Sequence, residues 1–427
     1  MVFIHNSVYS KDIENRVSFS ELSENIETDI SIVGGGYTGL SSAIELRERG
    51  YNVCLFEMNF LGFGCSGRNG GHLGQGWSGD FNKIEKNLPK KYHKLIWDTG
   101  IEAVETVRKR VKKYQINCDI QMGYVHGAIH KKQLKALQEE EKEWIKYKYE
   151  NLTFLENNLE VRKYVNTKEY IGGLYDKGSG HLHPMKYLQG LAKVASELGV
   201  KIYENTKIVK KINGLNNKLV TDKGHTIKTD ITLLCGNAYI EEVSDSFMKS
   251  KLAKVTSSIL ATKPFSKKLR EELFPKNVAV ADCNTALNYY RFDNKSRLVF
   301  GGRASYTNIN PKDVTPDLIY RITKVFPSLK NIDVEMVWSG YVGITVNRIP
   351  HFGRIDNKTY FAQGFSGHGV ALTSIAGKIM AEAISQESER FEILSKINHM
   401  TFPGGPFRTP VLAIAMSWFK LKDWLKI

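Results

Sequence analysis

The first regular hydrophobic pattern of the chain is a strand-like run, residues 29–33, that leads directly into three glycines. Residues 37–50 follow with apolar side chains at helical spacing and a final glycine, and a second strand-like run occupies residues 51–57. A buried strand, a glycine turn, an amphipathic helix and a second strand in this order predict a βαβ unit. Such a unit is typical of the beginning of a doubly wound parallel sheet.

The same two kinds of pattern recur further along the chain. Residues 251–340 are rich in strand-like runs, which indicates a second, mostly antiparallel sheet, and a strand, a glycine loop and a helix return at 359–384. We therefore expect an α/β fold (α+β overall), in which a Rossmann-like domain is interrupted by an inserted, mostly antiparallel β-sheet domain that binds the substrate. Helices are predicted over 91–117, 131–149 and 186–199, and strands within 123–130, 200–212 and 220–239.

This order of elements predicts a discontinuous first domain. Its expected segments are 29–90, 165–237 and 341–390, and the inserted substrate or cap domain is expected to comprise 91–164 and 238–340. Residues 1–28 lack periodicity and are expected to form a polar N-terminal arm, while 391–427 end in a tail helix. The tail helix is too short to span a membrane. We expect it to dock against the protein's own core, with weak peripheral contact to a membrane as the alternative.

The composition is that of an ordinary globular protein. Hydrophobic residues make up 42% and charged residues 25% of the 427 residues, which excludes a disordered chain, a collagen-like fibre and a small disulfide scaffold. We find neither an apolar run long enough to cross a bilayer nor the features of a signal peptide, so a cytoplasmic protein is expected. The five cysteines are scattered and never form a C-x-x-C pair, which favours reduced thiols.

The formal net charge is +15, with 60 Lys and Arg against 45 Asp and Glu. A basic balance is compatible with nucleic acid, an anionic membrane face or an anionic substrate. However, residues 131–150 interleave both signs, as an exposed helix does. We therefore expect the excess charge to be spread over solvated faces, and a nucleic-acid partner is not expected.

The first glycine turn carries a dinucleotide-binding pattern. Gly34, Gly36 and Gly39 fit G-x-G-x-x-G, and Tyr37 and Thr38 stand between the second and third glycines. These glycines permit a tight turn, close approach of backbone to a pyrophosphate, and packing of helix on strand. Glu57, at the end of the second strand, is placed to accept hydrogen bonds from a ribose diol and to repel a 2′-phosphate.

A second glycine-rich run distinguishes between the two dinucleotides that use this pattern. Residues 61–76 read LGFGCSGRNGGHLGQG, where an NAD-binding domain usually continues into another helix. A long flexible backbone suits contact with the pyrophosphate, ribityl chain and ring of a flavin. The run therefore favours FAD.

At this point the chain resembles a known family. The strings GFGCSGRNGG (62–71), LVFGGRASY (298–306), ITVNRIPHFGR (344–354) and YFAQGFSGHGVAL (360–372) are similar to those of the FAD-dependent D-amino-acid oxidase/glycine oxidase superfamily. Within that superfamily, the γ-glutamylputrescine oxidoreductase type of amine oxidase is the most similar. The resemblance extends from about residue 29 to residue 416.

The resemblance implies a set of FAD-binding positions. The first loop and Glu57 would hold the ADP half, the second glycine-rich run would line the ribityl chain and the flavin edge, and Ile208 would contact adenine through its main chain. The backbone of residues 364–369 would lie against the ring, and the helix that begins near Val370 would direct its positive end at it. The implied residues are Gly34, Gly36, Tyr37, Thr38, Gly39, Glu57, Cys65, Ser66, Arg68, Asn69, Gly70, Gly71, Ile208, Gly236, Asn237, Gly367, Gly369 and Val370.

Two departures from related enzymes concern the flavin. Related sarcosine oxidases attach FAD to a C-terminal cysteine, but no cysteine follows Cys283 here, and Arg68 stands where some dehydrogenases carry a flavin-linked histidine. We therefore expect non-covalent FAD. The lysines of the sarcosine oxidases correspond to Ala371 and Val299, so both O2 and another electron acceptor remain open.

The implied reaction is oxidation of a primary or secondary amine by hydride transfer to flavin N5, followed by hydrolysis of the imine to an aldehyde or keto acid. Candidate catalytic residues are His368, Arg303 and Tyr341, although a histidine in a glycine loop is as often a structural hydrogen-bonding group. Arg291 and Arg348 are further candidates for gripping a carboxylate, and Tyr290 and Trp338 for walling the pocket.

Alternatives from other functional classes remain open. They are a flavoenzyme acting on a modified tRNA base, a sarcosine, glycine or D-amino-acid dehydrogenase, and a non-catalytic flavin-binding subunit. No metal site is expected, because the pairs His181/His183 and His126/His130 have no cysteine or carboxylate companions at ligand spacing.

Overall fold

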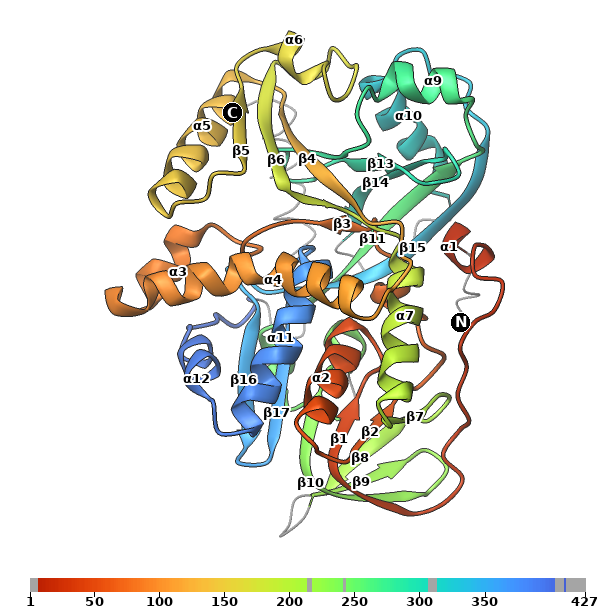
Figure 1. Ribbon diagram of the computed structural model, residues 1–427, viewed down its shortest axis with the longest axis vertical. Coiled ribbons are helices and arrows are strands. Elements are labelled where there is room, and N and C mark those ends of the chain that lie inside the picture. Colours follow the sequence, from red (N-terminus) through yellow and green to blue (C-terminus); the bar gives the residue numbers. More distant parts are fainter. Residues whose placement is uncertain (1–6, 213–216, 241–242, 306–312, 404–410, 412–427) are drawn as a thin grey trace.

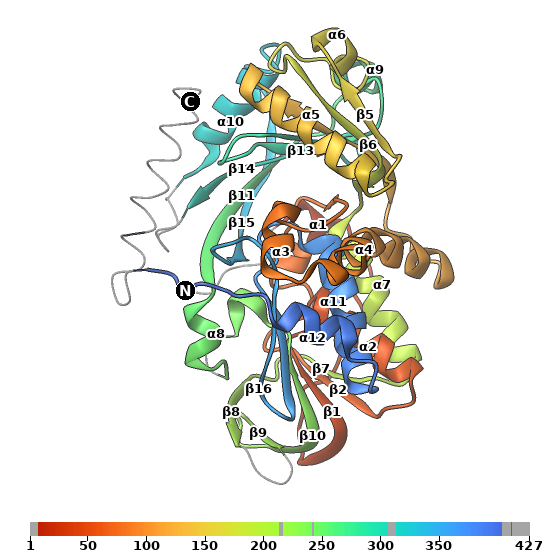
Figure 2. The same cartoon turned by 90° about the vertical axis from the view of Figure 1, so that its left-hand side faces the viewer.

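The computed structural model describes residues 7–403 and 411, apart from 213–216, 241–242 and 306–312, and it describes residues 303–305 without their side chains. Two β-sheets occupy opposite ends of the molecule, with the helices α4 (His93–Lys113) and α11 (Gly369–Ile384) between and beside them (Figures 1 and 2). In the described part of the chain, no helix is both long and apolar enough to cross a membrane.

The first sheet contains the predicted βαβ unit. Its strands follow the order β16-β17-β10-β1-β2-β7, and the hairpin of β8 and β9 joins it beside β10. The pairs of β1 with β10 and β2, of β10 with β17 and of β2 with β7 are parallel. The strands are β1 (Ile26–Val33), β2 (Val53–Phe56), β7 (Lys201–Tyr203), β8 (Ile208–Ile212), β9 (Asn217–Thr221), β10 (Thr226–Leu234), β16 (His351–Asp356) and β17 (Thr359–Gln363).

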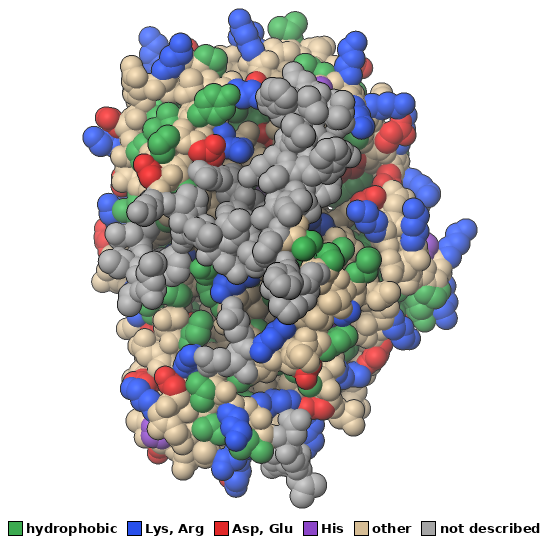
Figure 3. All heavy atoms as spheres, turned by 180° about the vertical axis from the view of Figure 1, so that it is seen from behind, with side chains coloured by type: hydrophobic (Ala, Val, Ile, Leu, Met, Phe, Trp, Pro, Cys, Tyr) green, Lys and Arg blue, Asp and Glu red, His purple; other side chains and the backbone are tan. Residues whose placement is uncertain are grey.

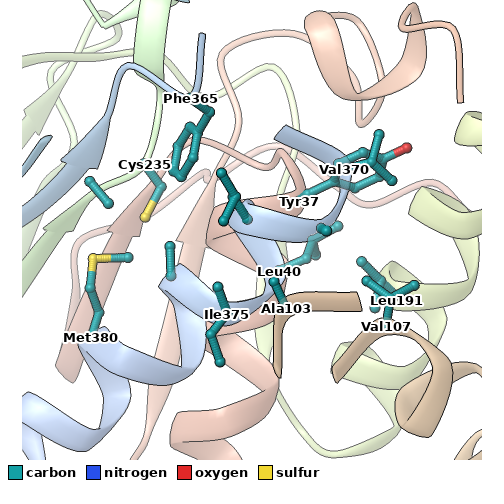
Figure 4. Close-up of a cluster of buried hydrophobic side chains, with 14 of the residues drawn as sticks. Tyr37, Leu40, Ala103, Val107, Leu191, Cys235, Phe365, Val370, Ile375 and Met380 are labelled. Atoms are coloured by element: carbon teal, nitrogen blue, oxygen red, sulfur yellow. The ribbon is translucent and has the colours of Figure 1, made fainter. Parts of the chain in front are cut away.

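The helices of this sheet bury the apolar faces that the sequence indicates. In α2 (Tyr37–Glu48), Leu40, Ala43 and Ile44 are fully buried. Helices α2, α4 and α11 and α7 (Pro184–Glu197) contribute to one core cluster, of which Figure 4 shows a part. A Cβ at Gly377 of α11 would lie 2.5 Å from Ser41 Cβ, so the backbones of α11 and α2 approach closely only because this position is glycine.

The second sheet is mostly antiparallel, as predicted. Its order is β15-β11-β14-β13-β12-β4-β6-β3, with β5 beside β6, and of these pairs β12 with β4 is parallel. Helices α5 (Lys131–Lys146), α9 (Lys267–Leu273) and α10 (Thr315–Val325) lie around it (Figure 1). The strands are β3 (His72–Leu73), β4 (Gln121–Ala128), β5 (Leu152–Leu155), β6 (Gly172–His181), β11 (Ala253–Thr262), β12 (Ala279–Asp282), β13 (Tyr289–Phe292), β14 (Leu298–Ser305) and β15 (Val334–Ile344).

Three elements lie in a different part of the fold from the one expected. Strands β3 and β6 fall within 29–90 and 165–237, which were expected in the first domain, but they pair within the second sheet. Helix α4 falls within 91–164, which was expected in the inserted domain, but it packs against α11. Periodicity identifies a strand or a helix, whereas its partner is chosen by long-range packing that no local pattern records.

The two ends of the chain lie partly within the described residues. Residues 1–28 were expected to be a polar arm, but they contain α1 (Val8–Lys11), in which Val8 and Tyr9 are fully buried, and the start of β1. Helix α12 (Glu389–Ser395) is described, whereas most of the expected tail helix, residues 412–427, lies outside the described residues. Figure 3 shows Lys and Arg side chains intermixed with Asp and Glu on one face, as the interleaved sequence indicates.

A buried histidine pair gives the protein a predicted sensitivity to acid. His351 of β16 and His399 are each 4% exposed, and their ring centroids lie 4.4 Å apart. Burial, with smaller contributions from His399 and Lys251, lowers the pKa of His351 to about 3. Burial, with a contribution from Lys251, lowers the pKa of His399 to about 4. The unfolded chain, in which both rings titrate near 6.5, therefore binds more protons in acid.

We expect the free energy of unfolding to fall as the pH drops from about 6.5 towards 4, by up to about 2 kcal/mol per histidine at pH 5. Urea denaturation at pH 7.5, 6 and 5 measures this slope. His399→Asn is expected to reduce the slope, and His225→Asn, in the turn before β10, to leave it unchanged. Equal slopes in all three proteins would contradict the assignment.

Candidate active site

A cavity of about 1640 Å³ lies between the two sheets. The first sheet contributes the ends of β1, β2 and β10 and the loop before α11, and the second contributes β4, β12 and β13. Ligands of α/β proteins bind at this edge, beyond the carboxyl ends of the parallel strands. Of the FAD-binding positions implied by the sequence, all except Gly39 and Gly71 line the cavity.

The first glycine turn is held by close backbone contacts. Gly34 has φ +111°, and a Cβ there would lie 2.9 Å from the carbonyl carbon of Cys235. A Cβ at Gly39 would lie 2.0 Å from the oxygen of Gly34, so Gly39 serves the packing of helix on strand rather than the cavity wall. Gly36 is the N-cap of α2 and has no capping side chain, and the first N–H of the helix, that of Tyr37, donates to Ser66 Oγ (3.1 Å) from the second glycine-rich run. The positive end of the helix dipole therefore lies at the cavity, where it favours an anion.

Glu57 stands at the end of β2 and closes the glycine turn. Its Oε2 accepts a hydrogen bond from Gly35 N (2.9 Å), and its Oε1 accepts one from Asn59 N (3.0 Å). Burial raises the pKa of Glu57, the two N–H groups lower it, and the nearby Glu204 raises it again. The carboxylate lines the cavity, which is the position that the sequence predicts for a ribose contact.

The second glycine-rich run is fixed by its own polar side chains. Arg68 is buried, and it donates from Nε to Phe63 O (2.6 Å) and from Nη1 to Ser339 O (3.1 Å). Asn69 accepts from Gly71 N through Oδ1 (2.8 Å) and donates to Cys65 O (3.1 Å). These bonds leave Cys65, Ser66, Arg68, Asn69 and Gly70 on the cavity wall.

Gly71 has a different role from the one expected. It has φ +79°, and a Cβ at this position would lie 2.1 Å from Leu182 O and 2.9 Å from Arg291 Nη2. The residue therefore permits close packing behind the wall. The sequence alone does not show whether a glycine is required for close packing or for contact with a cofactor, because both require a backbone without a side chain.

The loop before α11 carries His368 as the N-cap residue of that helix. The ring lines the cavity, and its Nε2 lies 3.1 Å from Gln75 O, so Nε2 carries the hydrogen and donates it. Burial lowers the pKa of His368, which keeps the ring neutral. A Cβ at Gly74 would lie 2.5 Å from the ring, so the glycine-rich run and His368 fit against each other.

Asn237 connects the end of β10 to this loop. It has φ +47°, and its Oδ1 accepts a hydrogen bond from Gly364 N (2.9 Å). Gly236 and Ile208 line the cavity, and so do Gly367, Gly369 and Val370 of the segment that begins at Gly364. One side-chain amide therefore joins two segments that the sequence separates by more than 120 residues.

The structure does not bring Tyr341 to the cavity wall. Its ring lies 4.2 Å from Lys254 Nζ, and its N–H donates to Tyr239 Oη (3.1 Å). Lys254 and Tyr239 line the cavity, and Tyr341 contacts both from behind the wall. The expectation that Tyr341 is a catalytic residue is therefore not supported by its position. Arg303 lies in β14, and its side chain is outside the described residues.

Among the other candidates, Arg348 lines the cavity and three residues do not. Arg291 is buried and donates from Nε to Gly70 O (2.7 Å), so it supports the glycine-rich run and is not available to a substrate carboxylate. Tyr290 lies in the core, where its hydroxyl bonds Tyr170 Oη (2.8 Å). Trp338 donates from Nε1 to Arg68 O (2.9 Å).

Several cavity residues were missed by the sequence analysis. On helix α5, which was interpreted as exposed, Glu140 lines the cavity, and burial together with Glu143, Asp80 and Asp176 raises its pKa to about 7. Asp282 also lines it, and burial raises its pKa to about 7. Tyr124, His126, Trp144 and Tyr289 complete this part of the wall. The signal available in the sequence was the cluster of four glutamates at 139–143.

His126 of β4 is a further histidine on the cavity wall. Burial, with a smaller contribution from His368, lowers its pKa to about 4. Its ring lies 4.7 Å from that of Tyr124. Among the described residues, no group of three or more His, Cys, Asp or Glu side chains is placed to hold a metal ion.

Comparison with known proteins adds sequence and fold relationships. The model of the family described as "FAD dependent oxidoreductase" (DAO) matches residues 29–383. The γ-glutamylputrescine oxidoreductase of Escherichia coli (strain K12) is 34% identical over 423 residues, which cover 99% of each chain. Among solved structures, L-proline dehydrogenase from P. horikoshii superposes with a TM-score of 0.72 at 22% identity, covering 87% of this chain and 96% of the other. Glycine oxidase from Geobacillus kaustophilus superposes with a TM-score of 0.70 at 17% identity, covering 87% and 98%.

Proposed function

The chain belongs to the DAO family of FAD dependent oxidoreductases, and from this premise we propose that it oxidises an amine of the γ-glutamylputrescine type. The observation that carries the proposal is the 34% identity with the Escherichia coli γ-glutamylputrescine oxidoreductase over 99% of both chains. No observation of similar strength favours a modified tRNA base as the substrate. Sarcosine, glycine and D-amino acids are alternative substrates that a flavin titration distinguishes from γ-glutamylputrescine.

The residues around the cavity fit FAD, which the family uses. Gly34 and Gly35 line the cavity, and a side chain there would collide with Gly236 or with Leu61 and Glu57. Unlike Gly39 and Gly71, these two positions therefore present bare backbone on the wall, as a cradle for a pyrophosphate requires. The N-terminus of α2 supplies a positive dipole end at the same place. The cavity of about 1640 Å³ also has room for a dinucleotide together with a small substrate.

We assign the ADP half to the first turn and Glu57, and the flavin half to residues 65–70 and the loop before α11. When bound, FAD would accept a hydride from the carbon atom next to the amine nitrogen. The N-terminus of α11 would favour negative charge on the pyrimidine side of the ring. His368, held neutral by burial and bonded to Gln75 O, would position the glycine-rich run against that ring.

The substrate end of the cavity supports a positively charged ligand. Trp144 adds an aromatic face to its wall. Glu140 and Asp282 line it with pKa values raised by burial to about 7, and of the two Asp282 already accepts hydrogen bonds from Asn284 and Asn288. Such carboxyls can bind an ammonium group when ionised and are matched to accept a proton at neutral pH. Oxidation requires the reacting nitrogen to be unprotonated. We therefore assign both the binding of the ammonium group and the removal of its proton to this part of the wall.

The test is an anaerobic titration of the flavin absorption bands of the purified holoenzyme. γ-Glutamylputrescine is expected to bleach them, whereas sarcosine, glycine and D-alanine are expected to leave them largely unchanged. Admission of air then distinguishes O2 from another acceptor, because only an oxidase recovers its bands rapidly. Bleaching by an amino acid alone would replace the proposed substrate class, and a protein that binds no FAD would refute the proposal.

A further inference from the structure

We propose that residues 7–22, here called the N-terminal strap, hold both ends of the FAD site in place. In Figure 1 this segment runs down the right-hand side of the molecule, from α1 beside the second sheet towards the bottom of the first sheet. None of its residues lines the cavity, so the strap would act on the FAD site only through the residues that it contacts. Tyr9 and Arg16 are its two positioning residues.

Tyr9 supports the flavin end from behind. Its side chain is fully buried, with its ring 5.2 Å from that of Trp338 and its hydroxyl 3.4 Å from Arg291 Nη2. Trp338 donates to Arg68 O (2.9 Å), and Arg291 donates to Gly70 O (2.7 Å). The two backbone carbonyls of the glycine-rich run are therefore fixed by side chains that Tyr9 packs against.

Asp12 anchors this part of the strap to the second sheet. It forms ion pairs with Arg297 and with Lys295 (2.7 Å), and it lies 3.3 Å from His183 Nε2. Burial alone would raise the pKa of Asp12, but hydrogen bonds from His183, Arg297 and Lys295 outweigh burial and hold this pKa well below its usual range. A buried, fully paired carboxylate of this kind fixes the position of α1.

Arg16 supports the dinucleotide end through Glu204. It pairs with both carboxylate oxygens of Glu204, at 2.5 Å and 3.1 Å. The same oxygens accept hydrogen bonds from Phe19 N (3.0 Å) and Leu61 N (2.6 Å). Leu61 is the residue that a Cβ at Gly35 would strike, at 2.3 Å, so Glu204 holds the side of the first glycine turn.

The strap also reaches the residue beside the adenine position. Leu22 N donates to Thr206 Oγ1 (3.1 Å), and Thr206 N donates to Glu57 O (2.9 Å). Thr206 lines the cavity two residues before Ile208. Two hydrogen bonds through Thr206 thus connect the strap to Glu57. Glu57 in turn accepts a hydrogen bond from Gly35 N of the first glycine turn.

Charge explains why Arg16 matters to the cofactor site. Glu204 is 1% exposed and lies near Glu57, whose pKa it raises. Among the described residues its ionic partner is Arg16, which lies 188 positions away in the sequence. Without it, a buried carboxylate would remain uncompensated beside the residue placed to bind the ribose, which is strongly unfavourable.

The test measures FAD affinity by titrating apoprotein with FAD and following the quenching of flavin fluorescence. Arg16→Ala is expected to raise the Kd for FAD by about tenfold or more. Arg16→Lys is expected to recover most of the loss, and Arg16→Ala with Glu204→Gln to recover part of it, since the charge is then removed. Glu21→Gln, which breaks the exposed pair with Lys223 in the same strap, is the matched control and should leave the Kd unchanged.

For the flavin end, Tyr9→Leu is expected to shift the visible circular dichroism bands of bound FAD. The inference is overturned if Arg16→Ala binds FAD as the parent does, if Glu21→Gln loses as much affinity, or if Glu204→Gln gives no recovery. Unchanged dichroism in Tyr9→Leu would overturn the role of Tyr9. No amine is used, so these results do not depend on the proposed substrate.

Discussion

Gly34→Ala is expected to weaken FAD binding by more than about 100-fold. Gly34 has φ +111°, where an L side chain costs roughly 1–3 kcal/mol, and its Cβ would lie 2.9 Å from Gly236 N and from the carbonyl carbon of Cys235. These contacts are backbone on both sides, so β1 and the end of β10 would have to separate. That movement would open the cradle proposed for the pyrophosphate.

The measurement is FAD retention by the purified variant, from the absorbance at the flavin band relative to protein, together with the thermal midpoint of the apoprotein. Gly50→Ala is the matched control, because Gly50 has φ +89° but nothing within 4 Å of the added Cβ. It is expected to cost about 1 kcal/mol of stability and to keep FAD. If Gly34→Ala retained FAD as well as Gly50→Ala does, the cradle would be misassigned.

Glu140→Gln is expected to lower kcat/KM for a cationic amine by about 10- to 100-fold. The carboxylate lies on the cavity wall, and the repulsion it receives from Glu143, Asp80 and Asp176 makes this region attractive to a positive group. The neutral amide keeps the size of the side chain and removes its charge. Activity towards an uncharged amine analogue should fall much less.

The pH dependence gives the second part of this test. The pKa of Glu140 is raised to about 7, so the ionised form that attracts a cation is present above pH 7 and is lost as the pH falls below 7. KM for the cationic substrate should therefore rise on acidification from pH 8 to pH 6, and this rise should be weaker in Glu140→Gln. Glu141→Gln is the control on the same helix, because Glu141 bonds Phe154 N and does not line the cavity. Equal losses in both variants would argue against a role for Glu140 in binding.

Local patterns determined the first half of the site. The glycine spacing at 34–39, the strand before it and the acidic residue at position 57 all lie within one βαβ unit, and each can be recognised without knowing the rest of the fold. The same is true of β12, β13 and β14 in the second sheet, which follow one another along the chain and pair antiparallel as neighbours. The helical spacing of Leu40 and Ile44 likewise identified α2 and two of its buried residues, although Ser41 and Ser42 are buried as well.

The rest of the site is decided by contacts between distant segments. Arg291 looked like a substrate-binding residue but is buried against Gly70, which precedes it by 221 positions. Glu140 looked like part of a solvated helix but lies on the cavity wall, because α5 packs over β4 and β6. Charge and spacing do not record which face of a polar helix meets a cavity.

The sequence by itself thus determined the cofactor class, the first sheet's opening unit and the family, since these depend on residues that are close along the chain. Tertiary structure alone decided that β3 and β6 join the second sheet, which carboxyls line the cavity, and that the N-terminal arm pairs with Glu204. The physical reason is that burial raises the cost of an unpaired charge, so the partner of Glu204 is fixed by the folded surroundings and not by its neighbours in sequence.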